Sequence, residues 1–313
     1  MLPKLSTFPV VANPPKPFLK WAGGKSQLIK QMDNLFPNKL LNGTIKKYVE
    51  PFVGGGAVFW YMADKYQIPE LFIYDINVEL VIAYKTIKYH VDDVISILSD
   101  IETKFLSFDE IQRNKYFYNV RIQFNQRKQY IDLQTYNLEW VERTAQLIFL
   151  NKTCFNGLFR VNSKGDFNVP IGKYKKPSIC DRQNLKTAAQ VLQRTHISHG
   201  DFSKCENFVD NDTLVYFDPP YRPISHTSSF TAYSQQTFND SEQLRLRDFF
   251  TKLDKKGALL VLSNSDPKNE NENDNFFETA YADYHIERVK AKRNINSNGL
   301  KRKPINELLI MNY

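Results

Sequence analysis

The residues that most suggest chemistry are Asp218, Pro219, Pro220 and Tyr221, which directly follow a strand-like apolar run over residues 214–217. A carboxylate can accept hydrogen bonds from an amino group and stabilise the positive charge that develops on its nitrogen during attack on a methyl carbon. We therefore predict that Asp218 orients a planar NH2 group and that the Pro219 carbonyl is its second acceptor. The Tyr221 ring would stack on a flipped-out base. A proline-rich turn without chemistry is the alternative interpretation.

A second segment, residues 50–56, has the composition of a cofactor-binding turn. Its strand-like run ends in three glycines, which let a backbone approach a ligand closely, and a helical pattern follows. We expect Phe52, Gly54 and Gly56 to contact the cofactor. Asp75 ends the next strand-like run about 20 residues further on, where an acidic residue binds ribose hydroxyls in related folds. NAD and nucleotide sites use the same device, and an aspartate here could equally cap a turn.

The tripeptide GKS at residues 24–26 resembles the end of a phosphate-binding loop. The first glycine of such a loop would fall at position 19, which is Leu19. We therefore exclude an NTPase. The segment instead predicts a tight turn before a helix over residues 26–36, with Trp21 and Lys25 facing a ligand.

Two basic stretches and a net charge of +8 favour a polyanionic partner. Residues 151–176 hold six lysines and arginines against one acid, interleaved with aromatic residues, which is typical of a loop that reads a nucleic-acid groove. Residues 288–303 hold seven basic residues and no acid. A solvated face explains the second stretch equally well.

Other features set the expected surroundings of the protein. Its three cysteines are too widely spaced for a disulfide framework or a metal knuckle, which points to a reducing cytoplasm. The proline-broken N-terminus does not resemble a signal peptide, and the apolar run over residues 258–262 is too short to span a bilayer. We therefore expect no membrane partner. His196 and His199 have no third ligand nearby in sequence, so we expect no metal site either.

These segments must be positioned by an alternation of short strands and helices, which predicts a doubly wound, mostly parallel α/β sheet. Buried parallel-type strands are expected at residues 48–53, 71–74, 196–198, 214–217, 259–262 and 308–311. Helices are expected at residues 57–65, 78–89, 182–193 and 241–255, the last capped by Ser241.

The alternation stops in the middle of the chain, where the pattern becomes helical. Helices are expected at residues 91–105, 108–125 and 138–150, followed by a polar, glycine-containing stretch. We infer a catalytic, cofactor-binding domain made of residues 1–90 and 181–313. Residues 91–180 would form an inserted helical target-recognition domain.

In this order, the segments resemble the Dam-type (D12 class) family of site-specific DNA adenine-N6 methyltransferases over almost the whole chain. The matching runs are FLKWAGGKSQL, EPFVGGGAVF, YDIN, CFNGLFRVNSKGDFNVPIGKYKKP, DPPY, TSSFTAY and INSNGLKRKPINELLIMNY. The resemblance implies methyl transfer from S-adenosylmethionine, with S-adenosylhomocysteine as product, to N6 of adenine in double-stranded DNA. It points to the GATC-modifying branch, either beside a restriction endonuclease that it need not contact or as an orphan methylase.

The resemblance also assigns roles residue by residue. Trp21, Lys25, Asp75 and Asp218 fall at the S-adenosylmethionine site, and Asp201 falls where the family often contacts the cofactor's adenine. The positions that read GATC match Lys20, Leu158, Arg160, Pro170 and Tyr174, and those that support the opened helix match Phe155 and Asn156. The family often has Tyr where this chain has Phe155, which keeps a stacking ring and loses a hydroxyl.

Two alternatives remain open at this point. A protein glutamine methyltransferase also positions a planar NH2 group, but typically carries Asn in place of Asp218 and lacks a basic insertion. A nucleic-acid-binding module without catalysis would have no need of DPPY together with the glycine turn and Asp75. The oligomeric state, a preference for hemimethylated sites and activity on single-stranded DNA are not determined by the sequence.

Overall fold

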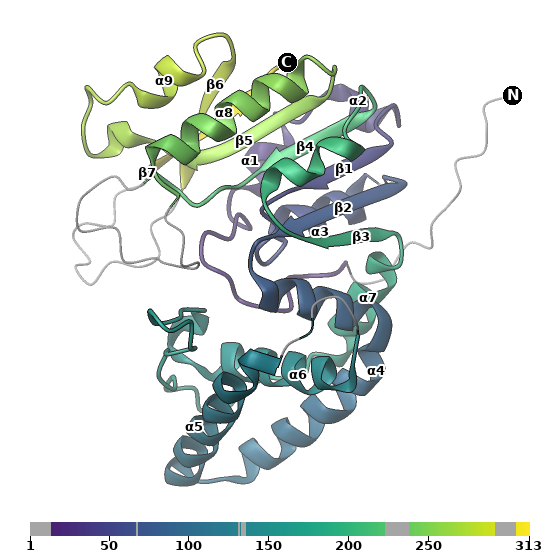
Figure 1. Cartoon of the computed structure of the whole chain (residues 1–313), viewed down its shortest axis with the longest axis vertical. Coiled ribbons are helices and arrows are strands. Elements are labelled where there is room, and N and C mark those ends of the chain that lie inside the picture. The colour runs from purple at the N-terminus through teal and green to yellow at the C-terminus, as the bar shows by residue number, and fades with distance from the viewer. Residues whose placement is uncertain (1–13, 67, 131, 133–135, 223–237, 292–304) are drawn as a thin grey trace, which may run out of the picture.

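The described strands form one sheet in the order β3-β2-β1-β4-β5-β7-β6 (Figure 1). The computed structural model describes residues 14–66, 68–130, 132, 136–222, 238–291 and 305–313. The strands are β1 (Lys47–Glu50), β2 (Glu70–Asp75), β3 (Thr195–His199), β4 (Thr213–Phe217), β5 (Leu259–Ser265), β6 (His285–Ala291) and β7 (Ile305–Met311). The strands from β3 to β5 are mutually parallel, which confirms the predicted doubly wound, mostly parallel α/β fold.

Two features at one edge of the sheet differ from the prediction. The run at residues 308–311, predicted as a parallel-type strand, belongs to β7, which is antiparallel to both β5 and β6. An apolar run reports burial on both faces but carries no information on direction. Strand β6 was not predicted, because its alternation of exposed and buried residues overlaps the second basic stretch and forms no continuous apolar run. Most of that stretch, and the TSSFTAY segment, lie outside the described residues.

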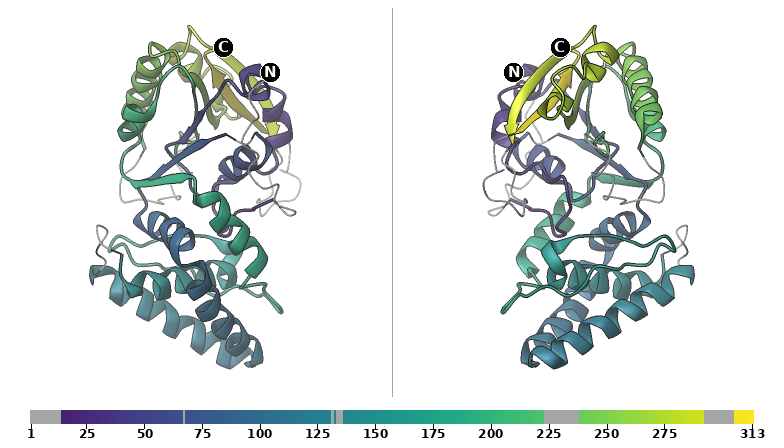
Figure 2. Two further views of the ribbon diagram at one scale, coloured as in Figure 1. Left: turned by 90° about the vertical axis from the view of Figure 1, so that its right-hand side faces the viewer. Right: turned by 90° about the vertical axis from the view of Figure 1, so that its left-hand side faces the viewer.

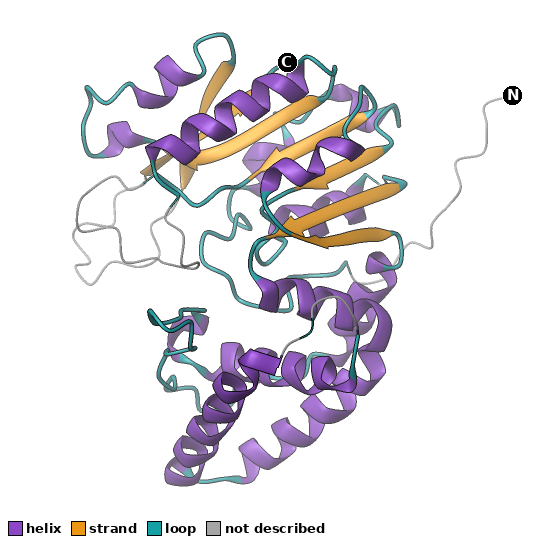
Figure 3. Ribbon diagram, in the orientation of Figure 1, coloured by secondary structure: helices purple, strands orange, loops and turns teal. Residues whose placement is uncertain are grey.

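Helices cover both faces of the sheet (Figure 3). They are α1 (Ile29–Asp33), α2 (Asn38–Leu41), α3 (Ala57–Lys65), α4 (Val78–Ser107), α5 (Glu110–Gln126), α6 (Leu138–Thr153), α7 (Arg182–Leu192), α8 (Asp240–Asp254) and α9 (Phe276–Ala280). Successive strand residues face opposite sides: Tyr48 packs with α1, α3, α4 and α7, whereas Val49 packs with α8 and α9. The expected cap Ser241 is wrong, since α8 begins at Asp240 and Asn239 accepts from the Glu242 N–H at 3.1 Å. Helix α1 is also shorter than the expected helix over residues 26–36.

The long helix α4 links the sheet to a helical lobe, formed by the part of α4 beyond His90 together with α5 and α6. His90 has non-helical backbone angles (φ −140°, ψ 38°), so α4 bends between the two helices expected at residues 78–89 and 91–105. The lobe extends beyond the β3 edge of the sheet (Figure 2). Phe105, Phe117 and Phe149 of the lobe belong to the same apolar cluster as Tyr48 of β1. The apolar core of the lobe is therefore continuous with the core on one face of the sheet.

A buried ion pair fixes the lobe to the first turn of α4. The Arg143 Nε of α6 donates to Glu79 Oε2 at 2.7 Å, and Arg143 Nη1 donates to the Phe124 carbonyl at 2.9 Å. Arg143 and Glu79 are both nearly inaccessible to water. Within the described ranges, none of the helices has the length and apolar character needed to cross a membrane.

Candidate active site

The candidate site lies where β1 and β4 end side by side. These parallel neighbours lie where the strand order reverses, and ligands of open α/β sheets bind at the carboxyl ends of strands at such a point. The glycine turn follows β1, Asp75 ends β2, Asp201 follows β3 and Asp218 follows β4. The sheet therefore brings the four predicted segments to one edge (Figure 1).

Asp218 is held by two donors on one of its oxygens. The Lys25 ammonium lies 2.7 Å from Asp218 Oδ1, and the Ser263 hydroxyl of β5 donates to the same oxygen at 2.9 Å. Lys25 is 3% exposed and also donates to the Gly23 carbonyl at 2.6 Å, whereas the Asp218 side chain is 20% exposed. Among the described residues these contacts engage Oδ1, so Oδ2 can accept from a ligand. Lys25 and Asp218, which the resemblance assigned to the same cofactor site, are thus in contact, and Ser263 was not foreseen.

A buried acid behind Asp218 also escaped the sequence analysis. Glu50 ends β1, and its Oε2 accepts from the Tyr48 hydroxyl at 2.6 Å. Burial raises the pKa of Glu50 well above its ordinary value, and the nearby Asp218 carboxylate acts in the same direction, while Tyr48 and Lys25 oppose it. Its position immediately before the glycine turn is the only sequence signal that could have singled it out. The two carboxyl groups thus differ in surroundings, since Asp218 alone has an ammonium in contact.

The glycine turn has a shape that side chains would obstruct. Gly54 and Gly56 have φ of 50° and 72°, in the left-handed region that favours glycine. A Cβ at Gly54 would lie 2.9 Å from Trp21, and one at Gly56 would lie 2.6 Å from the Tyr84 hydroxyl. Trp21 thus lies directly against the turn, as expected of two segments that share a ligand.

Asp75 orders this turn from the neighbouring strand. Its Oδ2 accepts from the Gly54 N–H at 2.9 Å and its Oδ1 from the Asn77 N–H at 2.8 Å. Burial raises the pKa of Asp75 to about 6, against the effect of these backbone hydrogen bonds. Asp75 therefore caps the turn, as the alternative interpretation of this residue proposed. Its predicted contact with the ribose stays a prediction.

Aromatic rings lie on both sides of the glycine turn. Trp21 stacks on Phe159 with ring centres 5.1 Å apart, and Phe52 lies 5.4 Å from Phe202 and 5.8 Å from Phe238. Such rings suit the flat base of a nucleoside cofactor.

Asp201 is already engaged within the protein. Arg245 donates to its two oxygens at 3.0 and 2.7 Å, and the Ser203 N–H donates at 3.0 Å. The Arg245 contact lowers the pKa of Asp201 to about 2. The expected contact between Asp201 and the cofactor's adenine stays a prediction.

Tyr221 projects from the DPPY segment into a charged setting. Its hydroxyl donates to Glu307 Oε2 of β7, and the Lys25 ammonium lies 4.6 Å from the centre of its ring. Pro219 is buried, whereas Pro220 is exposed and its carbonyl accepts from Gln243. Glu307 is a further site residue that the sequence analysis did not name.

The residues predicted to contact DNA gather on a hairpin over residues 154–171. Bridges join Cys154 to Ile171 and Val161 to Phe167, and the Phe155 N–H donates to the Pro170 carbonyl at 2.8 Å. Beside the bridge between Val161 and Phe167, Arg160 Nε donates to the Asn168 side chain at 2.8 Å. The surface of the 154–171 hairpin carries the predicted contacts Phe155, Asn156, Arg160 and Pro170 as exposed residues, with Leu158 half-buried.

Lys20 joins the 154–171 hairpin from the N-terminal segment. The Asn151 side chain accepts from the Lys20 N–H at 2.7 Å and donates to the Lys20 carbonyl at 2.9 Å. The Lys20 ammonium lies 4.8 Å from the Tyr174 ring centre, and a Cβ at Gly157 would clash with the lysine chain at 2.2 Å. Lys20 precedes Trp21, so this contact links the predicted DNA surface to the predicted cofactor site.

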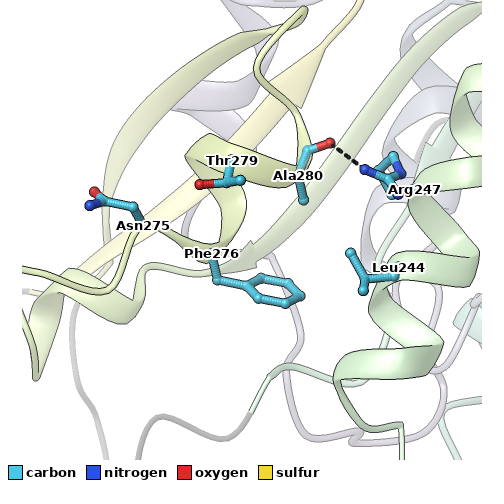
Figure 4. Close-up of a pocket in the computed structure, with 6 residues that line it drawn as sticks. All are labelled: Leu244, Arg247, Asn275, Phe276, Thr279 and Ala280. Atoms are coloured by element: carbon cyan, nitrogen blue, oxygen red, sulfur yellow. Dashed lines mark hydrogen bonds between the residues drawn. The ribbon is translucent and has the colours of Figure 1, made fainter.

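A separate cavity of about 370 Å³ lies between α8 and α9 (Figure 4). Leu244 and Phe276 face it from opposite sides, and Arg247 donates to the Ala280 carbonyl at 3.2 Å along its wall. It holds none of the predicted site residues. In the part of the chain that the structure covers, no three His, Cys, Asp or Glu side chains gather in a way that could bind a metal.

The sheet order, the glycine turn after β1 and the DPPY segment after β4 define a Rossmann-like methyltransferase. The chain belongs to the D12 class of N6 adenine-specific DNA methyltransferases, whose family profile matches residues 21–295. It is therefore a DNA adenine-N6 methyltransferase.

Named relatives support this membership. The chain is 51% identical to the Type II methyltransferase M.MjaIII of Methanocaldococcus jannaschii over 299 residues, which are 95% of this chain and 99% of the relative. It is 35% identical to the Type II methyltransferase M1.LlaDCHI of Lactococcus lactis, with 95% of each chain covered. It is 34% identical to the DNA adenine methylase of Haemophilus influenzae, with 94% of this chain and 92% of the relative covered.

Proposed function

We propose that the methyl donor is S-adenosylmethionine, bound at the edge formed by β1, β2 and β4. The glycine turn provides the space, the Asp75 carboxylate lies at the end of β2 for the ribose, and Phe52 and Trp21 offer ring faces. The cofactor supplies an electrophilic methyl group on a sulfonium. Lys25 and Asp218 would hold its charged methionine end, since an ammonium and a carboxylate are the complements of an amino acid.

We also propose that Asp218 orients the adenine amino group. The N6 lone pair is delocalised into the ring, so the nitrogen becomes nucleophilic only when its hydrogens are held by acceptors out of the ring plane. Asp218 Oδ2 and the Pro219 carbonyl would be those acceptors, and the carboxylate would stabilise the charge that develops on N6. Lys25 and Ser263, both on Oδ1, keep the carboxylate from rotating. Tyr221 would stack on the flipped adenine.

The 154–171 hairpin is our proposed reader of double-stranded GATC, within a target-recognition domain of residues 91–180 between the two parts of a catalytic domain. The Asn168 side chain accepts from Arg160 Nε, which holds the guanidinium and leaves the fork of its two terminal nitrogens to donate to a ligand. Such a fork matches the O6 and N7 acceptors of a guanine. Lys20 would contact the guanine beside the target adenine, and Leu158 and Pro170 the thymine methyl.

The names of the relatives support a proposal for the biological role. Two of them are named Type II methyltransferases and another is named a DNA adenine methylase. We propose protection of host DNA beside an endonuclease that need not touch this chain, or action as an orphan methylase. The observation that carries the whole proposal is the junction at Lys20 and Trp21 between hairpin and glycine turn.

A restriction digest tests the proposed site. Plasmid from cells that express the protein should resist an endonuclease blocked by N6-methyladenine in GATC, and should be cut by one that requires this modification. The Asp218→Ala variant is the control and should leave the plasmid unmodified. Protection of a different sequence, with GATC left unmodified, would refute the roles given to Lys20, Leu158, Arg160 and Pro170 and leave the adenine chemistry intact.

A further inference from the structure

The backbone on both sides of Tyr221 is fixed by two buried amide side chains. Gln243 of α8 donates through Nε2 to the Pro220 carbonyl at 3.0 Å, and Asn264 of β5 accepts from the Arg222 N–H at 3.2 Å. Asn264 Nδ2 also donates to Gln243 Oε1 at 3.2 Å, so the two amides hold each other. Both are 1% exposed or less. The freedom left to Tyr221 is therefore rotation of its own side chain.

Glu307 and Lys25 both contact the Tyr221 side chain and limit its rotation. The Tyr221 hydroxyl donates to Glu307 Oε2, which fixes the far end of the ring, and the Lys25 ammonium lies 4.6 Å from the ring centre. One face of the ring is thus occupied by the ammonium. A flat ligand that stacks on Tyr221 is limited to the opposite face.

The sheet register gives Glu307 a rigid place. It lies directly opposite Ser265 on β5 and Val289 on β6, and directly paired residues share a face of the sheet. Ser263, two residues before Ser265, points to the same face and donates to Asp218. Strand β7 therefore presents its carboxylate beside Asp218 without being part of the DPPY segment.

Burying the Glu307 carboxyl group at this position costs free energy of folding. Burial raises the pKa of Glu307, and the Asp218 carboxylate adds to this, while Lys25 and the Tyr221 hydroxyl oppose it. An apolar side chain of similar size would avoid the desolvation of a carboxyl group. Stability alone thus gives no reason for an acid at this position.

We propose that Glu307 is a positioning residue that fixes the orientation of the Tyr221 ring, so that the flipped adenine meets one defined face of it. The role deepens the proposed function and rests on it, because it takes Tyr221 as the stacking partner of the base. Glu307 acts through Tyr221 and does not itself touch the reacting atoms.

The experiment compares Glu307→Leu, Glu307→Gln and Tyr221→Phe by single-turnover methylation. Glu307→Leu and Tyr221→Phe each break the same hydrogen bond and keep the ring, and each should slow methyl transfer by about tenfold, the effect of a small loss of alignment. The double variant should be no slower than either single variant, since coupled residues are not additive. Glu307→Gln keeps an acceptor oxygen and should stay within about threefold of the wild-type rate.

Two further measurements separate positioning from a structural role. The melting temperature of Glu307→Leu should not fall, whereas a structural carboxylate would lower it when removed. DNA with 2-aminopurine at the target position should fluoresce more strongly in complex with Glu307→Leu than with the wild type, because a loosely held ring quenches the flipped base less. Glu287→Leu on β6, whose carboxylate faces His285, is the matched control and should match the wild type in rate and fluorescence.

The outcomes distinguish this inference from the function on which it rests. Multiplicative losses in the double variant, a wild-type rate for Glu307→Leu, or loss of rate only together with loss of stability would each overturn the positioning role. Tyr221→Ala tests the stacking role itself. If Tyr221→Ala is inactive while Glu307→Leu is fully active, the positioning role alone fails; if Tyr221→Ala is fully active, the proposed stacking fails with it.

Discussion

The Lys25 ammonium lies 2.7 Å from the Asp218 carboxylate, although one residue precedes the first helix and the other follows the fourth strand. The lysine is almost fully buried, and this contact offsets part of the cost of burying an ammonium. The pair joins the proposed cofactor site to the proposed acceptor site. Changes at either residue should therefore affect more than one step of the reaction.

Replacing Asp218 with Ala should abolish methyl transfer while the fold survives, with a loss of stability because the buried Lys25 then lacks its partner. In the proposed mechanism the carboxylate orients a weak nucleophile, so its loss should slow the chemical step by about a hundredfold or more. Asp218→Asn keeps an acceptor for Lys25 and Ser263 and should lose less. Single-turnover rates measure this step directly, and an alanine variant within a few-fold of the wild type would remove Asp218 from the mechanism.

Acid should weaken S-adenosylmethionine binding through Asp75, whose pKa burial raises to about 6. Above that pH the ionised carboxylate can accept from ribose hydroxyls, and below it a proton occupies one oxygen. The affinity should therefore fall by up to about tenfold per pH unit below 6. The effect of Asp75 on folding stability has the opposite sign. Because folding raises the pKa of Asp75, its contribution to stability is fully present at a pH below the ordinary pKa of an aspartate and is lost as the pH rises through 6.

Calorimetric titration between pH 5 and 8 measures the affinity, with Asp75→Asn as the control that cannot titrate. The asparagine variant should bind more weakly at pH 8 and show a flatter pH profile. Equal profiles for the two proteins would show that another group, such as the buried Glu50, governs the pH dependence.

Arg160→Ala should relax the sequence preference without abolishing catalysis. Losing a guanidinium paired with a guanine should reduce discrimination at that base pair by about 1–3 kcal/mol. Asn168→Ala frees Arg160 Nε and should cause a smaller loss at the same base pair. Rates on GATC and on near-cognate duplexes give the ratio, with the exposed Arg182→Ala on α7 as the control. Uniform loss across all duplexes would instead indicate a phosphate contact.

Arg143→Ala should destabilise the fold strongly, because it leaves Glu79 buried without its partner. The expected loss in the free energy of unfolding is about 3–5 kcal/mol. Arg127 forms an exposed pair with Glu142 in the same lobe, and Arg127→Ala should lose about 0–1 kcal/mol. Denaturant unfolding measures both. Similar losses for the two variants would mean that the Arg143 pair contributes no more than a surface pair.

The sequence by itself determined the local features of this protein. The alternation of short apolar runs and helical patterns predicted the doubly wound sheet, because strands buried on both faces are continuous apolar runs, whereas the partly exposed β6 is not. The chemistry proposed for Asp218 and Tyr221 followed from residue types in one short segment. Even the bend of α4 at His90 falls between two helices that the pattern separated.

Only the tertiary structure decided which distant residues meet. Apolar periodicity reports which side of a strand is buried, but strand order and direction depend on contacts between segments far apart in sequence. The antiparallel β7 was for this reason misassigned, and its Glu307 was not connected to Tyr221. Ser263 reaches Asp218 only because β4 and β5 are neighbours in the sheet. The residues proposed to carry the chemistry were visible in the sequence, whereas those that hold them in place required the fold.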